Sequence, residues 1–325
     1  MNSENYNNSR RGFLKKSLVV GSLLPLMDSH ILATPLAKEK ANELKVHVFS
    51  KHLQFLNYQD MAEAAAEIGF DGVDLTVRPK GHVLPERVES DLPKAVEAIR
   101  KAGLSHTLMT TAVQDAGNAL DQKLLETAAK LGIKFYRMNW LRYPENKTIP
   151  EAVAEFQETV KDLGSLNKKL GLIGCYQNHS GDLAGASLWE LWDILEKSDK
   201  EHTGVQYDIR HAVVEGGLSW KNGLRLIQPQ IKILAIKDFV WEKKNGNYAV
   251  QNVPLGQGMV DFKSYFGLLK KYNIHVPVSL HYEYPLGGAE HGGFEITVDK
   301  KVVFNAMKKD LQWLHETWAQ AEPAK

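Results

Sequence analysis

From residue 45 onward, the chain switches repeatedly between a short apolar run and a longer amphipathic stretch. The short runs turn polar only at their carboxyl ends, which is typical of parallel strands that are buried on both faces. We predict strands at residues 46–50, 72–77, 105–111, 135–140, 172–178, 204–211, 231–239 and 276–284. We predict helices at residues 58–68, 92–102, 120–131, 150–170, 188–197, 218–227, 262–272 and 298–319.

Four predicted helices end in a glycine that leads directly into the next strand, at Gly69, Gly103, Gly132 and Gly171. Glycine readily adopts the left-handed conformation that ends a helix, so this repeat indicates short helix-to-strand loops. Eight strands, each followed by a helix, within about 280 residues predict an α/β fold, a single (β/α)8 TIM barrel over residues 38–325. The alternative is a doubly wound sheet, which usually has a glycine-rich turn after its first strand. Residues 46–52 contain no glycine.

Residues 1–37 have the pattern of a targeting signal that precedes the barrel. Arg10 and Arg11 are followed by Phe13-Leu14-Lys15 and then by a mildly apolar run at 17–27. This is the pattern of a twin-arginine export signal, so we expect a periplasmic or other extracytoplasmic location. The alternative is a basic tail before a short apolar helix. No apolar run reaches the roughly 18 residues that a membrane span requires.

Composition removes several classes of function. Lys and Arg total 40 against 39 Asp and Glu, so the net charge is +1 and no basic surface for nucleic acid is expected. A single cysteine excludes an internal disulfide framework, a cysteine-rich zinc site and an iron–sulfur cluster. The remaining classes are a globular enzyme and a globular binding protein, each formed by one barrel. Either class is compatible with a homo-oligomer.

Polar and ionisable residues gather at the predicted carboxyl ends of the strands, where a barrel carries its chemistry. Burying so many charges together without a ligand would be costly, so we expect one functional mouth. The candidate catalytic residues are Asp208, His211, Lys237, His281 and Glu283. The candidate substrate-binding residues are His82, Glu86, Arg137, Asn139, Gln177, Asn178, His179, Arg210, Asp238 and Trp241.

The order of these pieces resembles the xylose isomerase-like barrels, a family of sugar phosphate isomerases and epimerases. The resemblance spans about residues 45–319. Its pieces are Ile68-Gly69-Phe70-Asp71-Gly72-Val73-Asp74-Leu75, Gln177-Asn178-His179, Tyr207-Asp208-Ile209-Arg210-His211, Ile236-Lys237-Asp238-Phe239, Pro254-Leu255-Gly256-Gln257-Gly258 and Ser279-Leu280-His281.

The resemblance implies a divalent metal held by Glu, Asp, His and Glu at the ends of strands five to eight. In this chain only the Asp is kept, as Asp208, while the other three positions fall on Gln177, Ala235 and His281. Gln177, Asp208 and His281 could still hold one ion of Mn, Ni, Co, Zn or Mg. The alternative is a metal-free pocket in which the same three residues bind sugar hydroxyls.

The residues suit removal of a proton from carbon beside a carbonyl, which needs a base and a group that stabilises the developing oxyanion. We expect His281 and Glu283 to act as the acid/base pair and Lys237, paired with Asp238, to stabilise the oxyanion. A Schiff base on Lys237 is disfavoured, because a neighbouring carboxylate keeps a lysine protonated. The glycine-rich loop at 284–293 suits either a lid or a phosphate cradle.

These expectations combine into an exported isomerase, epimerase or lyase whose partner is a small sugar or keto-sugar. The alternative is a non-catalytic sugar-binding barrel, which the altered ligand set favours. A metal-dependent phosphodiesterase, as in the endonuclease branch of these barrels, is disfavoured by the neutral charge and the few ligands.

Overall fold

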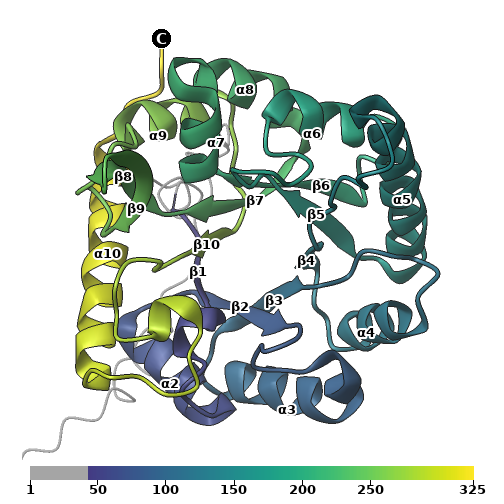
Figure 1. Ribbon diagram of the computed structural model, residues 1–325. Coiled ribbons are helices and arrows are strands. Elements are labelled where there is room, and N and C mark those ends of the chain that lie inside the picture. The colour runs from purple at the N-terminus through teal and green to yellow at the C-terminus, as the bar shows by residue number, and fades with distance from the viewer. Residues whose placement is uncertain (1–42) are drawn as a thin grey trace, which may run out of the picture. The chain divides into compact units, whose positions relative to one another are not determined.

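The computed structural model describes residues 43–325, so the predicted export signal at 1–37 lies outside the described residues. Eight parallel strands close into a barrel in the order β1-β10-β7-β6-β5-β4-β3-β2, which confirms the predicted fold (Figure 1). The strands are β1 (Val46–Phe49), β2 (Gly72–Val77), β3 (Ser105–Thr111), β4 (Phe135–Arg137), β5 (Ile173–Gln177), β6 (Thr203–Asp208), β7 (Ile231–Ile236) and β10 (Val278–Leu280).

Helices surround the barrel and cover the outer face of its sheet (Figure 1). They are α2 (Tyr58–Ile68), α3 (Val88–Lys101), α4 (Ala119–Lys130), α5 (Ile149–Leu170), α6 (Leu188–Ile194), α7 (Ile209–Gly216), α8 (Trp220–Ile227), α9 (Phe262–Lys271) and α10 (Lys300–Gln320). The four predicted glycines all have positive φ, and Gly69 and Gly171 cap α2 and α5. None of the helices in the described part is long and apolar enough to cross a membrane.

The interior of the barrel is a packed core and not a channel. Leu108, Cys175 and Ile233 are each at most 2% exposed and form a cluster of their own, one residue from each of three alternate strands. Side chains from alternate strands fill a TIM barrel in layers of this kind. The layer closes the barrel below its mouth, and burial raises the pKa of the Cys175 thiol well above its usual range.

The sixth strand ends earlier than predicted. It stops at Asp208, and the expected strand residues Arg210 and His211 lie in the first turn of α7. The Asp208 carboxylate accepts a hydrogen bond from the His211 backbone N–H at 3.2 Å, which is the capping contact that starts a helix. The N-terminus of α7 therefore lies at the mouth.

A hairpin outside the barrel sheet was not predicted. It consists of β8 (Asp238–Lys244) and β9 (Asn247–Val253), joined at Asn245 and Gly246, which both have positive φ. Asn-Gly is the preferred two-residue connection of such a hairpin. The seventh barrel strand therefore ends at Ile236, and Lys237 lies at the junction of barrel and hairpin.

Candidate active site

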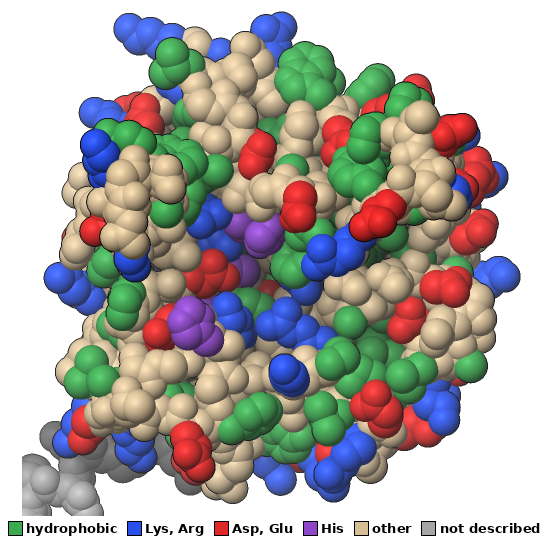
Figure 2. Space-filling view, viewed as in Figure 1, with side chains coloured by type: hydrophobic (Ala, Val, Ile, Leu, Met, Phe, Trp, Pro, Cys, Tyr) green, Lys and Arg blue, Asp and Glu red, His purple; other side chains and the backbone are tan. Residues whose placement is uncertain are grey.

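The carboxyl ends of the strands surround a hollow in which lysine, arginine, carboxylate and histidine side chains gather (Figure 2). Five of the predicted residues meet there in one network: Gln177, Asp208, Lys237, His281 and Glu283. They come from the ends of β5, β6, β7 and β10, which are neighbours in the barrel. The predicted convergence of these side chains at one mouth is therefore observed.

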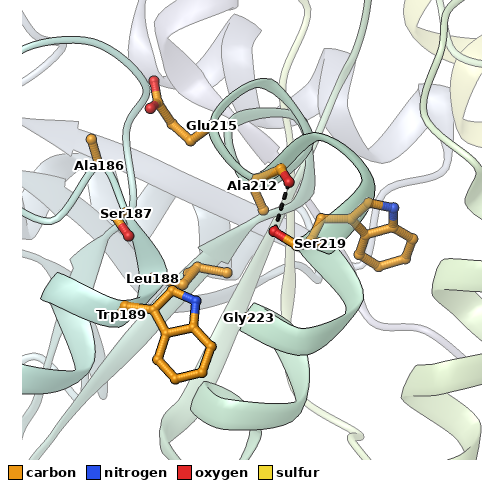
Figure 3. Close-up of a pocket in the computed structure, with 10 residues that line it drawn as sticks. Ala186, Ser187, Leu188, Trp189, Ala212, Glu215, Ser219 and Gly223 are labelled. Carbon is orange, nitrogen blue, oxygen red and sulfur yellow. Dashed lines mark hydrogen bonds between the residues drawn. The ribbon is translucent and has the colours of Figure 1, made fainter.

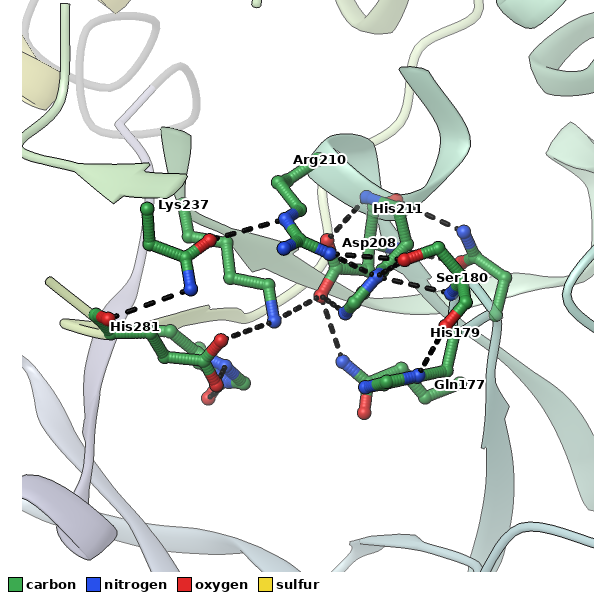
Figure 4. A network of polar contacts seen from close by, with 12 residues as sticks. Gln177, His179, Ser180, Asp208, Arg210, His211, Lys237 and His281 are labelled. Atoms are coloured by element: carbon green, nitrogen blue, oxygen red, sulfur yellow. Dashed lines mark hydrogen bonds and ion pairs between the residues drawn. The ribbon is translucent and has the colours of Figure 1, made fainter. Parts of the chain in front are cut away.

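Lys237 lies at the centre of this network. Its Nζ is 3.3 Å from Asp208 Oδ2 and 3.0 Å from Glu283 Oε2, and its side chain is only 4% exposed (Figure 4). The register explains the contact, because Asp208 pairs with Ala235 and Lys237 lies two residues after Ala235, just past the end of β7 and on the same face. The prediction that Lys237 pairs with Asp238 is wrong: its partners are Asp208 and Glu283.

Asp208 is completely buried and held on several sides. Gln177 Nε2 donates to its Oδ2 at 2.8 Å. The Asn178 side chain donates to the Asp208 backbone carbonyl at 3.0 Å and accepts from its backbone N–H at 2.8 Å. Asn178 is thus committed to the backbone of β6, and this buried amide holds Asp208 in place where we had predicted a substrate contact.

Glu283 joins two lysines and a histidine. Besides its contact with Lys237, its Oε1 is 3.5 Å from Lys51 Nζ and 3.9 Å from His281 Nδ1. Burial disfavours its charged form, but the two lysines and His281 outweigh this effect, so the pKa of Glu283 lies well below its usual range. Glu283 is therefore ionised at neutral pH, and its side chain is 22% exposed to the mouth.

His281 is a buried neutral histidine. Its ring stacks on Phe49 with centroids 4.4 Å apart, and its Nε2 is 3.2 Å from Ser279 Oγ. Burial lowers its pKa. Its Nδ1 has no hydrogen-bond partner among the described residues and faces Glu283, as the predicted acid/base pair requires.

Two more histidines lie in contact on the other side of Asp208, with the His179 and His211 ring centroids 4.0 Å apart and the ring planes 37° from parallel. His211 Nδ1 lies 2.8 Å from both Ser180 Oγ and Arg210 Nη1, so His211 accepts at Nδ1 and its Nε2 faces Asp208 at 3.6 Å. His179 Nδ1 donates to the Ser180 carbonyl at 3.0 Å, which leaves its Nε2 as an acceptor. Burial and then the charge of Lys237 lower the pKa of His179 to about 4.

Asp238 faces away from this network. Its carboxylate accepts the backbone N–H groups of Phe239, Gly256, Gly258 and Val260 at 2.8–3.2 Å. These four bonds tie the 256–260 loop to the start of β8. Asp238 therefore has a structural role here, and the structure gives it no contact with the mouth network.

Four other predicted substrate contacts also lie apart from the network. Asn139 bonds to Gln114 Oε1 at 3.1 Å in an open groove beside α5. Trp241 lies on the hairpin and is 44% exposed. The His82 ring lies near Tyr58 and Glu86 is exposed on the short helix Pro85–Arg87. In the sequence, these residues lie at predicted strand ends or in loops. In the structure, each side chain lies outside the network at the mouth.

Lys51, which was not predicted as a site residue, directly follows the predicted first strand at 46–50 and contacts Glu283. Its position at a strand end could have identified it. Asn252 was also not predicted as a site residue, and its Oδ1 accepts from Arg210 Nε at 3.2 Å. Asn252 reaches the mouth only because β9 folds back along β8, so its contact depends on the hairpin.

The three predicted metal ligands do not suit a divalent cation as they are arranged. Gln177 presents its amide nitrogen to Asp208, and its Oε1 accepts from Arg137 Nη1 at 3.2 Å. The ammonium of Lys237 approaches the same Asp208 oxygen. A cation at this carboxylate would meet a positive charge and an N–H group, and neither is a ligand.

Elsewhere among the described residues, Asp199, Glu201 and His202 lie close enough together to share an ion. They precede β6 and so belong to the end of the barrel opposite the mouth. Asp199 already accepts from Lys168 Nζ at 3.3 Å and from two backbone N–H groups. This group lies apart from the predicted chemistry.

The glycine-rich loop after β10 does not present a free phosphate cradle. The Glu290 carboxylate already accepts the backbone N–H groups of Leu286 at 2.8 Å and Gly288 at 2.9 Å. The loop is also fixed to the segment after β1, because His52 Nδ1 bonds to the Ala289 carbonyl and Gln54 Nε2 to the Gly292 carbonyl. Two of its N–H groups are therefore taken by Glu290, and those of Ala289, His291, Gly292 and Gly293 donate to carbonyls of the loop itself.

A separate cavity of about 100 Å³ lies between the start of α6 and the α7–α8 segment (Figure 3). Glu215 is the one ionisable side chain among its lining residues, and its Oε1 accepts the Gly181 N–H at 2.9 Å. Proton transfer needs a paired acid and base, which this cavity lacks. The mouth is therefore the stronger candidate for an active site.

The pH dependence of the unfolding free energy should reveal that Glu283 is ionised in the folded protein. Its pKa is lowered in the fold, so it contributes stability that is complete above its ordinary value of 4.5 and is lost as the pH falls through the lowered value. We expect the free energy of unfolding to decline on acidification, and to decline less in Glu283→Gln. Urea unfolding between about pH 3 and pH 6 measures this. Exposed Glu242→Gln is the control, and an equal decline in both variants would contradict the assignment.

A family model described as xylose isomerase-like TIM barrel matches residues 62–303. No curated protein matches the sequence significantly. Similar solved structures include D-allulose 3-epimerase from Methylomonas sp. in complex with D-allulose, with 14% identity over 84% of this chain and 97% of that one and a TM-score of 0.62. The 3-keto-D-glucoside 4-epimerase from E. coli has 15% identity over 84% and 100%, with a TM-score of 0.61. A xylose isomerase-like TIM barrel protein from Mycobacterium smegmatis in complex with magnesium has 14% identity over 86% and 99%, with a TM-score of 0.61.

Proposed function

We propose that this chain, which belongs to the xylose isomerase-like TIM barrel family, is an enzyme that removes a proton from the carbon beside a sugar carbonyl. An isomerase, an epimerase and a lyase share this step. The observation that carries the proposal is the buried Lys237 ammonium held between Asp208 and Glu283 at the barrel mouth. Structural neighbours that are sugar epimerases support the choice of a sugar.

Lys237 stabilises the oxyanion. An ammonium has three N–H groups, and the two carboxylates use two of them, so the third can bind a carbonyl oxygen. As the proton leaves carbon, negative charge develops on that oxygen. Lys237 is buried and already oriented, so its charge acts there with little screening by water.

Glu283 is the base. It is ionised, it is exposed to the mouth, and its Oε2 lies 3.0 Å from the ammonium that binds the carbonyl. A carbon adjacent to that carbonyl therefore lies within reach of a Glu283 oxygen. His281 Nδ1, 3.9 Å from Glu283 Oε1, can take the proton on. His179 offers a second neutral acceptor on the Asp208 side of Lys237, which suits return of a proton from a different direction.

Solvent exchange tests the proposal. The purified protein is incubated with a panel of keto-sugars in deuterated water, and loss of the C–H signal beside the carbonyl is followed by proton NMR. We expect exchange with at least one sugar, and no exchange with the Glu283→Gln variant. A protein that binds a sugar but never exchanges its proton would instead be the non-catalytic sugar-binding barrel.

The same proposal gives an expectation for metal removal. Because Lys237 supplies the positive charge at Asp208, we expect dialysis against EDTA to leave the exchange rate unchanged. Elemental analysis of the dialysed protein confirms that metal is absent. A rate that falls and returns when Mn, Co or Mg is added back would contradict the role of Lys237.

We also propose that the enzyme is exported by the twin-arginine route. The support is Arg10 and Arg11 followed by Phe13-Leu14-Lys15. The double substitution Arg10→Lys with Arg11→Lys is expected to keep the protein in the cytoplasm. Cell fractionation followed by immunoblotting measures this, and equal export of the variant and the original chain would contradict the proposal.

A further inference from the structure

Positive charge exceeds negative charge at the mouth. The cations that gather at the mouth are Lys51, Arg78, Arg137, Arg210 and Lys237, and the carboxylates near them are Asp74, Asp208 and Glu283. The two lysines contact Asp208 and Glu283, and the Asp74 carboxylate accepts hydrogen bonds from Thr110 and Ser279. The hollow in Figure 2 accordingly contains several blue side chains around few red ones.

Arg78 and Arg137 form no ion pair with a carboxylate within the described residues, although the charge of Asp74 lies near both. The Arg78 side chain makes no hydrogen bond or ion pair within residues 43–325, and its guanidinium carbon lies 5.6 Å from the centre of the Phe49 ring. Arg137 donates to Gln177 Oε1 and to the Thr111 carbonyl, both neutral, and its Nε has no partner there although it is buried. Burial and then the charge of Arg78 lower the pKa of Arg137, and the carboxylates Asp74 and Glu283 offset this only in part, so the two guanidinium groups repel each other.

The barrel order places these arginines across the mouth from Lys237. Arg78 follows β2 and Arg137 ends β4, and these strands flank β3. In the closed ring of eight strands, β3 is opposite β7, which Lys237 follows. A ligand with its carbonyl on Lys237 therefore extends toward the two guanidinium groups.

We propose that the substrate is a sugar acid, whose carboxylate binds between Arg78 and Arg137 while its carbonyl binds Lys237. This inference rests on the proposed function and names its substrate class. A guanidinium group matches a carboxylate through two parallel hydrogen bonds. A phosphate would gain most from free backbone N–H groups, and in the glycine-rich loop Glu290 and the loop carbonyls accept most of them.

Binding measurements on matched ligands test the proposal. Isothermal titration compares a keto-sugar acid with the neutral keto-sugar that lacks the carboxylate and with the corresponding sugar phosphate. The variants are Arg78→Gln, Arg78→Lys and, as a control, exposed Arg225→Gln on α8. We expect the sugar acid to bind the original chain most tightly and Arg78→Gln to weaken it about 10- to 100-fold. Arg78→Lys should lie between, and Arg225→Gln should change nothing.

Each result bears on one claim. Equal weakening of the neutral sugar by Arg78→Gln, or tighter binding of the phosphate than of the acid, would overturn the sugar-acid assignment. Unchanged C–H exchange in Glu283→Gln would instead overturn the proposed function, even if Arg78→Gln loses the acid. The Arg78 side chain makes no hydrogen bond or ion pair within the described residues, so the variant is expected to fold.

Discussion

Replacing Lys237 with methionine is expected to lower kcat by about 100- to 1,000-fold, because it removes the N–H donor for the oxyanion. Methionine is nearly as long and unbranched, so the packing around the site changes little. The Asp208 and Glu283 carboxylates would then lie close together without the charge that compensates them. Leaving the buried Asp208 without its ion partner is expected to cost about 3 kcal/mol of unfolding free energy.

The control for this variant is Lys232→Met, at the other end of the same strand. Steady-state rates give kcat, and urea unfolding gives the stability. We expect the control to keep both. Full activity in Lys237→Met, together with a normal fold by circular dichroism, would mean that another group stabilises the oxyanion.

The second large effect is expected from Asp208→Asn. Asparagine caps a helix about as well as aspartate, so the start of α7 should persist and the fold should remain nearly intact. Lys237 would keep only Glu283 as a charged partner and would shift toward it. A displacement of about 1 Å at a reacting group lowers kcat by roughly 100-fold, and we expect a loss of that size with KM little changed.

Asp238→Asn is the matched control, since it removes the charge from the other buried carboxylate beside Lys237. Asp238 binds only backbone N–H groups, so this variant is expected to lose stability and to keep kcat. The opposite outcome, with Asp238→Asn inactive and Asp208→Asn active, would exchange the roles that the structure gives to the two residues.

The alternation of short apolar runs with longer amphipathic stretches was enough to predict the barrel, because burial on both faces constrains every residue of a parallel strand. It was less informative where a strand ends. Asp208 looked like one more strand residue, although an aspartate before an amphipathic segment also starts a helix. Asn245-Gly246 was a hairpin signal within the stretch that we had interpreted as strand and loop.

The catalytic centre was predictable as a set of residues, but the partners within it were not. Lys237 and Asp238 are adjacent in sequence, and that adjacency suggested a pair. Successive residues of an extended chain point to opposite sides, so Lys237 faces the mouth while Asp238 faces the 256–260 loop. Arg78 was visible at a strand end, but its lack of a partner appears only once every neighbour is placed.

The layer of Leu108, Cys175 and Ile233 beneath the mouth also determines whether the Cys175 thiol can react with oxidants. Cys175 is the only thiol of the protein, and it is sealed inside this layer with its protonated form favoured. Thiolate is the reactive form, so the native fold presents no reactive thiol for oxidation or for a disulfide to a second copy. Alkylation of Cys175 therefore requires the barrel to open, and the rate of thiol labelling reads out how often it does.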